Sequence, residues 1–216
     1  GRVTKGKRPE MLVFWKARLV LLAVPKTGTT ALEAAFLPHA DAAILNPPQL
    51  KHMTVRRYRA RLARVFEQNG TRPMELMAVL REPVDWLSSW YRYRGRPALA
   101  GRPQSTADID FTRFVEAWLE EEPPEFARVG RQSRFVTGND GVPAVDHLFR
   151  HDRIDEAVHF LEHRLSVSVQ IERHNVSPEG RIAPLPSATK ERLRREAAAD
   201  FELWRALCTQ RPDAAQ

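Results

Sequence analysis

The sequence predicts an α/β fold in which a mainly parallel central sheet is flanked by helices. Two short, nearly continuous apolar runs, at residues 18–24 and 75–80, have the composition of strands that are buried on both faces. Each run is followed by a segment whose apolar residues have helical spacing, and this alternation continues along the chain. Strands that alternate with helices favour a parallel sheet with right-handed crossovers.

The first part of the chain contains three of the predicted strands. Asn46-Pro47-Pro48 ends the second of them, because proline lacks a backbone donor and restricts its neighbour. Thr54 is a good N-cap for an amphipathic helix with a basic face. In chain order we expect a strand at 18–24, a helix at 30–37, a strand at 42–45, a helix at 54–68, a strand at 75–80 and a helix that begins at Pro83.

The second part of the chain begins with a segment rich in Gly, Pro and Arg, which predicts a mobile, substrate-facing loop at 94–107. A helix burying three aromatic residues follows, and Pro123-Pro124 ends it. Beyond it we expect a strand at 145–149, a helix at 154–164, a strand at 167–171 and one long helix at 187–207.

Length and composition limit the function classes. We expect a single domain at residues 11–216, preceded by a flexible arm or tag remnant at residues 1–10. Cys208 is the only cysteine, which excludes an internal disulfide and favours a reduced, cytoplasmic setting. The apolar run that ends at Val24 is too short to span a bilayer. The formal net charge of +7 favours an anionic partner, with a generally solvated basic surface as the alternative.

The first chemical motif is Pro25-Lys26-Thr27-Gly28-Thr29-Thr30, between a predicted strand and a predicted helix. A helix N-terminus offers unpaired N–H groups, glycine lets the backbone approach an anion, and lysine and hydroxyl groups add donors. The lysine precedes the glycine, so this is not the Walker pattern, and a standard ATPase is disfavoured. We therefore predict a phosphate-binding loop; the alternative is an ordinary turn whose threonines cap the helix.

The second motif is Arg81-Glu82-Pro83, with Ser89 about two helical turns further on. An arginine at the carboxyl end of a strand can pair with a phosphate, and Ser89 can donate another hydrogen bond. Ligands of open α/β sheets bind at this edge. Arg81 alone would more often be a surface residue in a salt bridge, and its combination with Lys26 favours a second anion site.

Together the two motifs resemble the cofactor loops of the PAPS-dependent sulfotransferases, P-K-[ST]-G-T-T and R-x-P-x-x-x-x-x-S, where PAPS is 3′-phosphoadenosine 5′-phosphosulfate. The resemblance implies a P-loop NTPase-like three-layer fold. It also implies that residues 26–30 bind the phosphosulfate, and that Arg81 and Ser89 bind the 3′-phosphate of PAPS or of its product PAP. The motifs cover a small part of the chain.

Lys51-His52 follows the proline turn and precedes the basic helix. Sulfuryl transfer needs a base for the acceptor hydroxyl and positive charge at the leaving phosphate, which are the roles expected for His52 and Lys26. Several carbohydrate sulfotransferases resemble this chain in having a histidine or glutamate soon after the phosphosulfate loop. Lys51 is expected to contact the acceptor. A capping or surface role for His52 is the alternative, and Glu33, expected to be solvated, is the fallback base.

Two further segments, 131–135 and 174–177, resemble polar stretches of the carbohydrate-type branch. Arg131 and Gln132 are therefore expected to contact the acceptor, and loop groups that satisfy their own backbone are the alternative. No histidine arrangement predicts a metal site: His159 and His163 lie four residues apart, but no third ligand is evident.

These observations predict a sulfotransferase, of bacterial cytoplasmic type, that moves a sulfuryl group from PAPS to an acceptor hydroxyl. The excess of basic residues and the resemblance to the carbohydrate-type branch favour a sugar, and an anionic sugar in particular, as the acceptor. A lipid, a small alcohol and a phenol remain alternatives. Two rival functions remain: a nucleotide kinase or other phosphoryl transferase, and a nucleic-acid-binding module that uses the arginines of residues 56–64.

Overall fold

Five strands form one sheet in the order β3-β1-β2-β4-β5. In the computed structural model, residues 11–44, 46, 47, 50, 52–68, 72–171 and 182–209 are described. Apolar side chains dominate the central strands, as expected for strands covered on both faces. The strands are β1 (Met11–Phe14), β2 (Leu19–Leu22), β3 (Ala42–Ile44), β4 (Glu75–Leu80) and β5 (His147–Arg150).

The strand directions follow from the pairings. β2 pairs with β4 and β4 with β5 in parallel, whereas β1 is antiparallel to both β2 and β3. Among the strands of the described residues, β1 therefore runs against the other four. The prediction of an α/β fold with a mainly parallel sheet is confirmed. β1 was missed, although its four apolar residues carry the same signal as β2.

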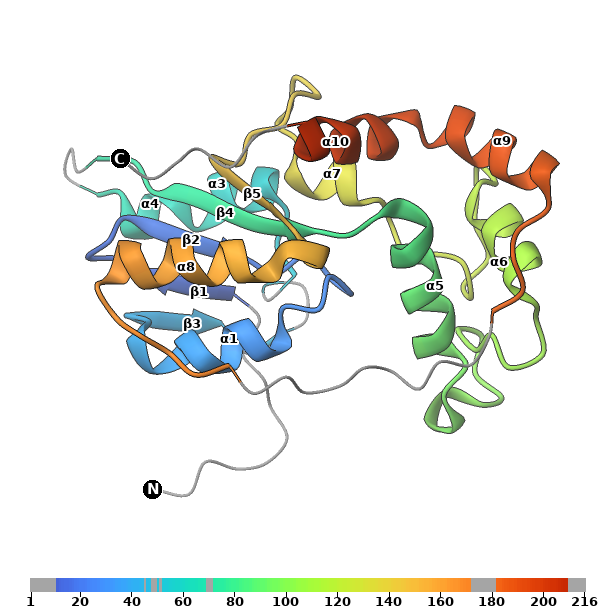
Figure 1. Ribbon diagram of the computed structural model, residues 1–216, viewed down its shortest axis with the longest axis horizontal. Coiled ribbons are helices and arrows are strands. Elements are labelled where there is room, and N and C mark those ends of the chain that lie inside the picture. Colours follow the sequence, from blue (N-terminus) through green and yellow to red (C-terminus); the bar gives the residue numbers. More distant parts are fainter. Residues whose placement is uncertain are drawn as a thin grey trace. The chain divides into compact units, whose positions relative to one another are not determined.

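Helices cover both faces of the sheet (Figure 1): α1 (Thr30–Phe36) and α8 (Ile154–Leu165) lie on one, and α3 (Val55–Arg61) and α4 (Ala63–Phe66) on the other. The first face buries Leu12, Phe14, Leu19, Leu21, Met77 and Val79 against α1 and α8. The alternate residues of the same strands are also buried. Burial on both faces explains why these strands are continuous apolar runs instead of alternating patterns.

The helix predicted at 54–68 is interrupted. Thr54 caps α3 by accepting a hydrogen bond from Arg57 N, but α3 ends at Arg61 and α4 begins only at Ala63, with Leu62 as a turn residue between them. Val65, an apolar residue of α4, is 58% exposed. The second half of this segment therefore lacks the apolar burial that supports a long amphipathic helix.

A second group of helices has its own core. It consists of α5 (Pro83–Arg94), α6 (Phe111–Trp118), α9 (Ser187–Glu196) and α10 (Ala198–Thr209). Trp86, Phe114, Trp118 and Leu193 are buried in this core. The single helix predicted at 187–207 is wrong, because the chain bends at Ala197, whose side chain is buried in the same core.

The strand predicted at 167–171 is also wrong. Val167, Val169 and Ile171 alternate as in a strand, and they pack against the core beneath α1 and α8. The backbone N–H of Val169, however, donates to a side-chain oxygen of Glu162 at 2.8 Å, and no ladder with a strand of the described residues forms. Alternating burial thus arose from packing alone.

The contacts divide the chain into two compact units. The sheet unit lies within Gly1–Leu80 and Gln132–Asn175, and the helical unit lies within Arg81–Arg131 and Val176–Gln216. Both units are built from two separate stretches of chain. The single sulfotransferase domain expected from the sequence stays a prediction. The helices found in the described residues include none that has the length and apolarity needed to cross a membrane.

Candidate functional site

The loop between β2 and α1 turns sharply. Lys26 has a φ of 65° and Gly28 a φ of 75°, so both lie in the left-handed region. Glycine adopts this conformation freely, whereas a residue with a Cβ atom is strained by roughly 1–2 kcal/mol. Strain of this kind persists only where the surroundings enforce it, and it clusters at ligand sites. The observed backbone is compatible with the predicted phosphate-binding loop.

Two threonines of the loop direct their hydroxyl groups into the protein. The Thr27 hydroxyl donates to the carbonyl oxygen of Val24 at 2.8 Å, and Thr27 is fully buried. The Thr29 hydroxyl donates to Oε1 of Glu33 at 2.6 Å. Glu33 is only 3% exposed, so the expectation that it is solvated is wrong. Thr27 and Thr29 could therefore offer a ligand their backbone N–H groups, while Thr30 is exposed and could offer its hydroxyl as well.

His151 lies against Gly28, a contact that sequence reasoning missed. A Cβ atom added to Gly28 would come closer than 3.0 Å to both Nε2 and Cδ2 of the His151 ring. His151 directly follows β5, which runs parallel to β4 and β2. The carboxyl ends of these strands lie at one edge of the sheet, where ligands of open α/β folds bind. A polar residue directly after a predicted strand was therefore the sequence signal that could have identified His151. Glycine at position 28 is required both by the backbone angle and by this ring.

His52 is fixed beside the start of the loop. Its Nδ1 atom lies 3.2 Å from the carbonyl oxygen of Ala23, the first residue after β2, and the side chain is half-buried. Because a carbonyl oxygen can only accept, Nδ1 carries a proton in this contact, and in the neutral ring the lone pair then lies on Nε2. Neighbouring Met53 is fully buried, which anchors the segment. The predicted base thus has the tautomer that can accept a proton.

Arg81 directly follows β4 and belongs to the helical unit. Its Nε atom donates to Oδ2 of Asp85 at 2.6 Å, and 17% of its side chain is exposed. Asp85 N in turn donates to the side chain of Glu82, which caps α5. Ser89 lies on the same helix and is half-buried. Asp85, which the sequence reasoning did not single out, orients the guanidinium group through one edge.

The predicted acceptor residues have different surroundings. Lys51 lies outside the described residues. Gln132 is buried at the first position of α7 (Gln132–Val136), in the sheet unit. Arg131, in the helical unit, lies over the ring of Trp118 at 4.3 Å, donates to the carbonyl oxygen of Glu196 at 3.2 Å and approaches buried Asp200 at 3.9 Å. Through these contacts Arg131 links α6, α9 and α10. The expected contacts of Arg131 and Gln132 with an acceptor stay predictions.

The predicted loop 94–107 is held at both ends. The guanidinium group of buried Arg94 donates to the carbonyl oxygens of Glu125 and Arg128. At the other end, the hydroxyl of Thr106 donates to Tyr91 O at 2.8 Å. A short turn of 3-10 helix, Pro97–Leu99, lies between them. The mobility of this loop and its contact with substrate stay predictions.

Compared with known proteins, the chain matches no family model, no curated protein and no solved structure. The function therefore has to be argued from the chain's own residues. Within the residues that the structure describes, no group of three or more His, Cys, Asp or Glu side chains could hold a metal ion.

Lys26, Gly28, His52 and His151 all belong to the sheet unit, in which His52 contacts Ala23 just before the loop and His151 contacts the loop at Gly28. Arg81, Ser89 and Arg131 lie in the helical unit. The binding of one ligand by both groups, which the two motifs imply, stays a prediction.

Proposed function

We propose that the chain is a PAPS-dependent sulfotransferase with a P-loop NTPase-like fold, acting on a hydroxyl group of a carbohydrate. One observation carries the proposal: the first motif begins three residues after β2 ends and the second directly follows β4, and β2 and β4 are neighbouring parallel strands. Ligands of open α/β sheets bind beyond the carboxyl ends of such strands. The net charge of +7 suits a doubly phosphorylated nucleotide.

The residues of the sheet unit have the chemistry that the transfer needs. In the proposed reaction the acceptor oxygen bonds to sulfur, while the bond between sulfur and the bridging phosphate oxygen breaks. Nε2 of His52 accepts the proton that the acceptor hydroxyl loses. The ammonium group of Lys26 and the loop N–H groups stabilise the negative charge that develops on the departing phosphate.

The residues of the helical unit distinguish the nucleotide. Arg81 binds the 3′-phosphate through its guanidinium group, which Asp85 orients, and Ser89 donates a further hydrogen bond. A hydrogen bond to a charged group is worth roughly 1.5–3 kcal/mol, which corresponds to about ten- to a hundredfold in affinity. The 3′-phosphate is the group that separates PAP from AMP, so Arg81 should set the preference between them.

Calorimetric titration with PAP, AMP and ATP tests the proposal directly. We expect the wild-type chain in chelator to bind PAP at least about tenfold more tightly than AMP. Arg81→Gln should remove this preference while the AMP affinity stays the same. Arg96→Gln is the control, because exposed Arg96 lies over Tyr93 on the same unit.

Two outcomes contradict the proposal. Tighter binding of ATP with magnesium than of PAP would favour a phosphoryl transferase. Equal loss of PAP and AMP affinity in Arg81→Gln would remove the 3′-phosphate role of Arg81. If PAP binds as expected, a screen of neutral and anionic sugars for sulfation identifies the acceptor.

A further inference from the structure

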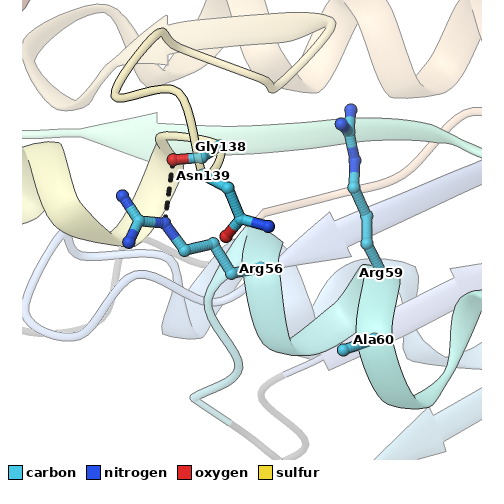
Figure 2. Close-up of a pocket in the computed structure, with 5 residues that line it drawn as sticks. All are labelled: Arg56, Arg59, Ala60, Gly138 and Asn139. Atoms are coloured by element: carbon cyan, nitrogen blue, oxygen red, sulfur yellow. Dashed lines mark hydrogen bonds between the residues drawn. The ribbon is translucent and has the colours of Figure 1, made fainter.

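A basic pocket opens on the sheet unit beside α3. Its volume is about 300 Å³, and Figure 2 shows its lining. Arg56, Arg59 and Ala60 come from α3, and Gly138 and Asn139 come from the segment after α7. In this view the amide of Asn139 lies between the side chains of the two arginines.

Both arginines are positioned by neutral groups. Nε of Arg56 donates to the carbonyl oxygen of Gly138 at 2.8 Å, and Nη2 of Arg59 donates to that of Ala144 at 3.2 Å. Neither guanidinium forms an ion pair with an acidic side chain in the part of the chain that the structure describes. Carbonyl partners fix the orientation of a guanidinium group but leave its charge uncompensated. The two charges therefore remain available to an anion.

The local fold explains why the arginines share the pocket. Val55 and Tyr58 are buried, which turns the opposite side of α3 outward. Arg56 and Arg59 are three residues apart and hence neighbours on the helix surface. The nearby carboxylate of Asp140 accepts a hydrogen bond from Val142 N at 3.0 Å, so it is engaged within its own loop.

We propose that this pocket binds an anionic group, a carboxylate or a sulfate ester, on a sugar ring of the acceptor. The inference rests on the proposed sulfotransferase function. Planar guanidinium groups suit these oxyanions, and the Asn139 amide adds a donor. The volume lies at the lower end of small-molecule sites, which fits one ring with its anionic group. The arginines also lie on the segment that begins with His52, the proposed base.

Two pairs of variants carry the same change of charge on the same helix. Arg56→Gln combined with Arg59→Gln removes the pocket charges, whereas Arg57→Gln combined with Arg61→Gln removes two exposed charges that do not line the pocket. The probes are a disaccharide with one uronic acid carboxylate, its carboxyl-reduced neutral counterpart, and that neutral counterpart carrying one sulfate ester. Binding to the full chain is measured by titration at constant salt.

We expect the wild-type chain to bind at least one of the two anionic probes about tenfold or more tightly than the neutral probe. The pocket pair should lose this preference and the control pair should keep it. Comparing the two anionic probes separates carboxylate from sulfate recognition. Equal binding of charged and neutral probes by the wild-type chain overturns the inference, and so does an equal loss in both variant pairs.

A second measurement does not depend on the variants folding. Amide chemical shifts of the wild-type chain should change at residues 56–60 and 138–139 when the preferred anionic disaccharide is added, and changes confined to other residues would overturn the inference. PAP titration of the same samples separates the two proposals. Normal disaccharide binding without PAP binding refutes the sulfotransferase, whereas PAP binding without a disaccharide response refutes the pocket.

Discussion

The Nδ1 atom of His52 lies 3.2 Å from the carbonyl oxygen of Ala23, at the point where β2 ends and the Lys26 loop begins. This contact joins two segments that are 29 residues apart in sequence. It fixes the ring orientation and directs the lone pair to Nε2. A histidine held in this way is prepared to accept a proton without first changing its tautomer.

His52→Ala should lower turnover by about 10²- to 10⁴-fold, the contribution typical of a positioned general base. The PAP affinity should stay within about twofold, because His52 acts on the acceptor and not on the nucleotide. Turnover under saturating PAPS and titration with PAP measure the two quantities. His39→Ala is the control, since His39 is an exposed histidine of the same unit. Loss of PAP binding in His52→Ala would refute its role as the base.

Lys26→Asn should nearly abolish turnover and leave the fold intact. Asparagine tolerates the left-handed backbone at position 26 but lacks the positive charge. Loss of one preorganised electrostatic contact lowers turnover by about 10²- to 10³-fold. Lys16→Asn serves as the control because Lys16 is exposed in the turn between β1 and β2. Activity retained in Lys26→Asn, with an unchanged melting temperature, would disprove the assigned role.

Gly28→Ala should destabilise the protein by about 2–4 kcal/mol, through backbone strain and the clash with His151. In a His151→Ala background the same change should cost only about 1–2 kcal/mol, because the strain remains and the clash is gone. Urea unfolding of the four proteins in this double-mutant cycle measures the difference. Strict additivity of the two substitutions would show that the ring does not restrict position 28.

Glu75 should stabilise the folded state at neutral pH, and this contribution should be lost in acid. Burial alone would raise the pKa of Glu75, but hydrogen bonds from His147, Arg164 and Arg72 outweigh it and lower the pKa from 4.5 to about 2. Because the pKa is lower in the folded state than in the unfolded state, the ionised carboxylate stabilises the fold at pH values above the unfolded-state pKa. This stabilisation is lost as the pH falls through the folded-state pKa. The contribution at neutral pH is on the order of 3 kcal/mol.

Glu75→Gln should therefore be less stable than the wild-type chain above about pH 5. The difference should shrink as the pH falls from 4.5 toward 2, the two values between which the pKa changes. Chemical unfolding at a series of pH values measures it. Glu121→Gln, at an exposed position, should show no comparable effect. A difference that is independent of pH would contradict the coupling of Glu75 to its three basic partners.

Tyr58→Phe should leave stability unchanged or raise it by up to about 1 kcal/mol. The Tyr58 hydroxyl is buried and finds no hydrogen-bond partner among the described residues, and burial raises its pKa. Removal of an unsatisfied polar group therefore carries little penalty. Tyr91→Phe is the matched control: the Tyr91 hydroxyl donates to Ile109 O at 2.7 Å, so its loss should cost about 1 kcal/mol. Destabilisation of Tyr58→Phe as large as that of Tyr91→Phe would refute this account.

The sequence was most informative where burial is continuous. β2 is fully apolar and β4 is apolar after Glu75, and α5 begins at Pro83, a residue suited to a first helical turn. The two strands and the start of α5 were predicted with nearly correct bounds. The errors arose where packing decides the outcome, as at residues 167–171, where apolar alternation exists without a partner strand.

The candidate site was predictable only in part. Motif spacing placed Lys26 and Arg81 after adjacent strands because local sequence determines where a strand ends. The contact of His151 with Gly28 could not be assigned in the same way, although a polar residue directly after a strand was a signal for His151 itself. His151 reaches Gly28 through the pairing of β5 in the sheet, which depends on contacts distant in sequence. The burial of Glu33 likewise depends on Thr29 and on the packing of α1.

The alternation of the two units along the chain has a consequence for biosynthesis. A ribosome releases β4 before the whole first stretch of the helical unit, and β5 emerges only after that stretch is complete. Until then the nascent chain exposes the side of β4 that later pairs with β5, and an open strand edge invites association with other chains. Aggregation during expression should accordingly respond to translation speed across residues 81–146.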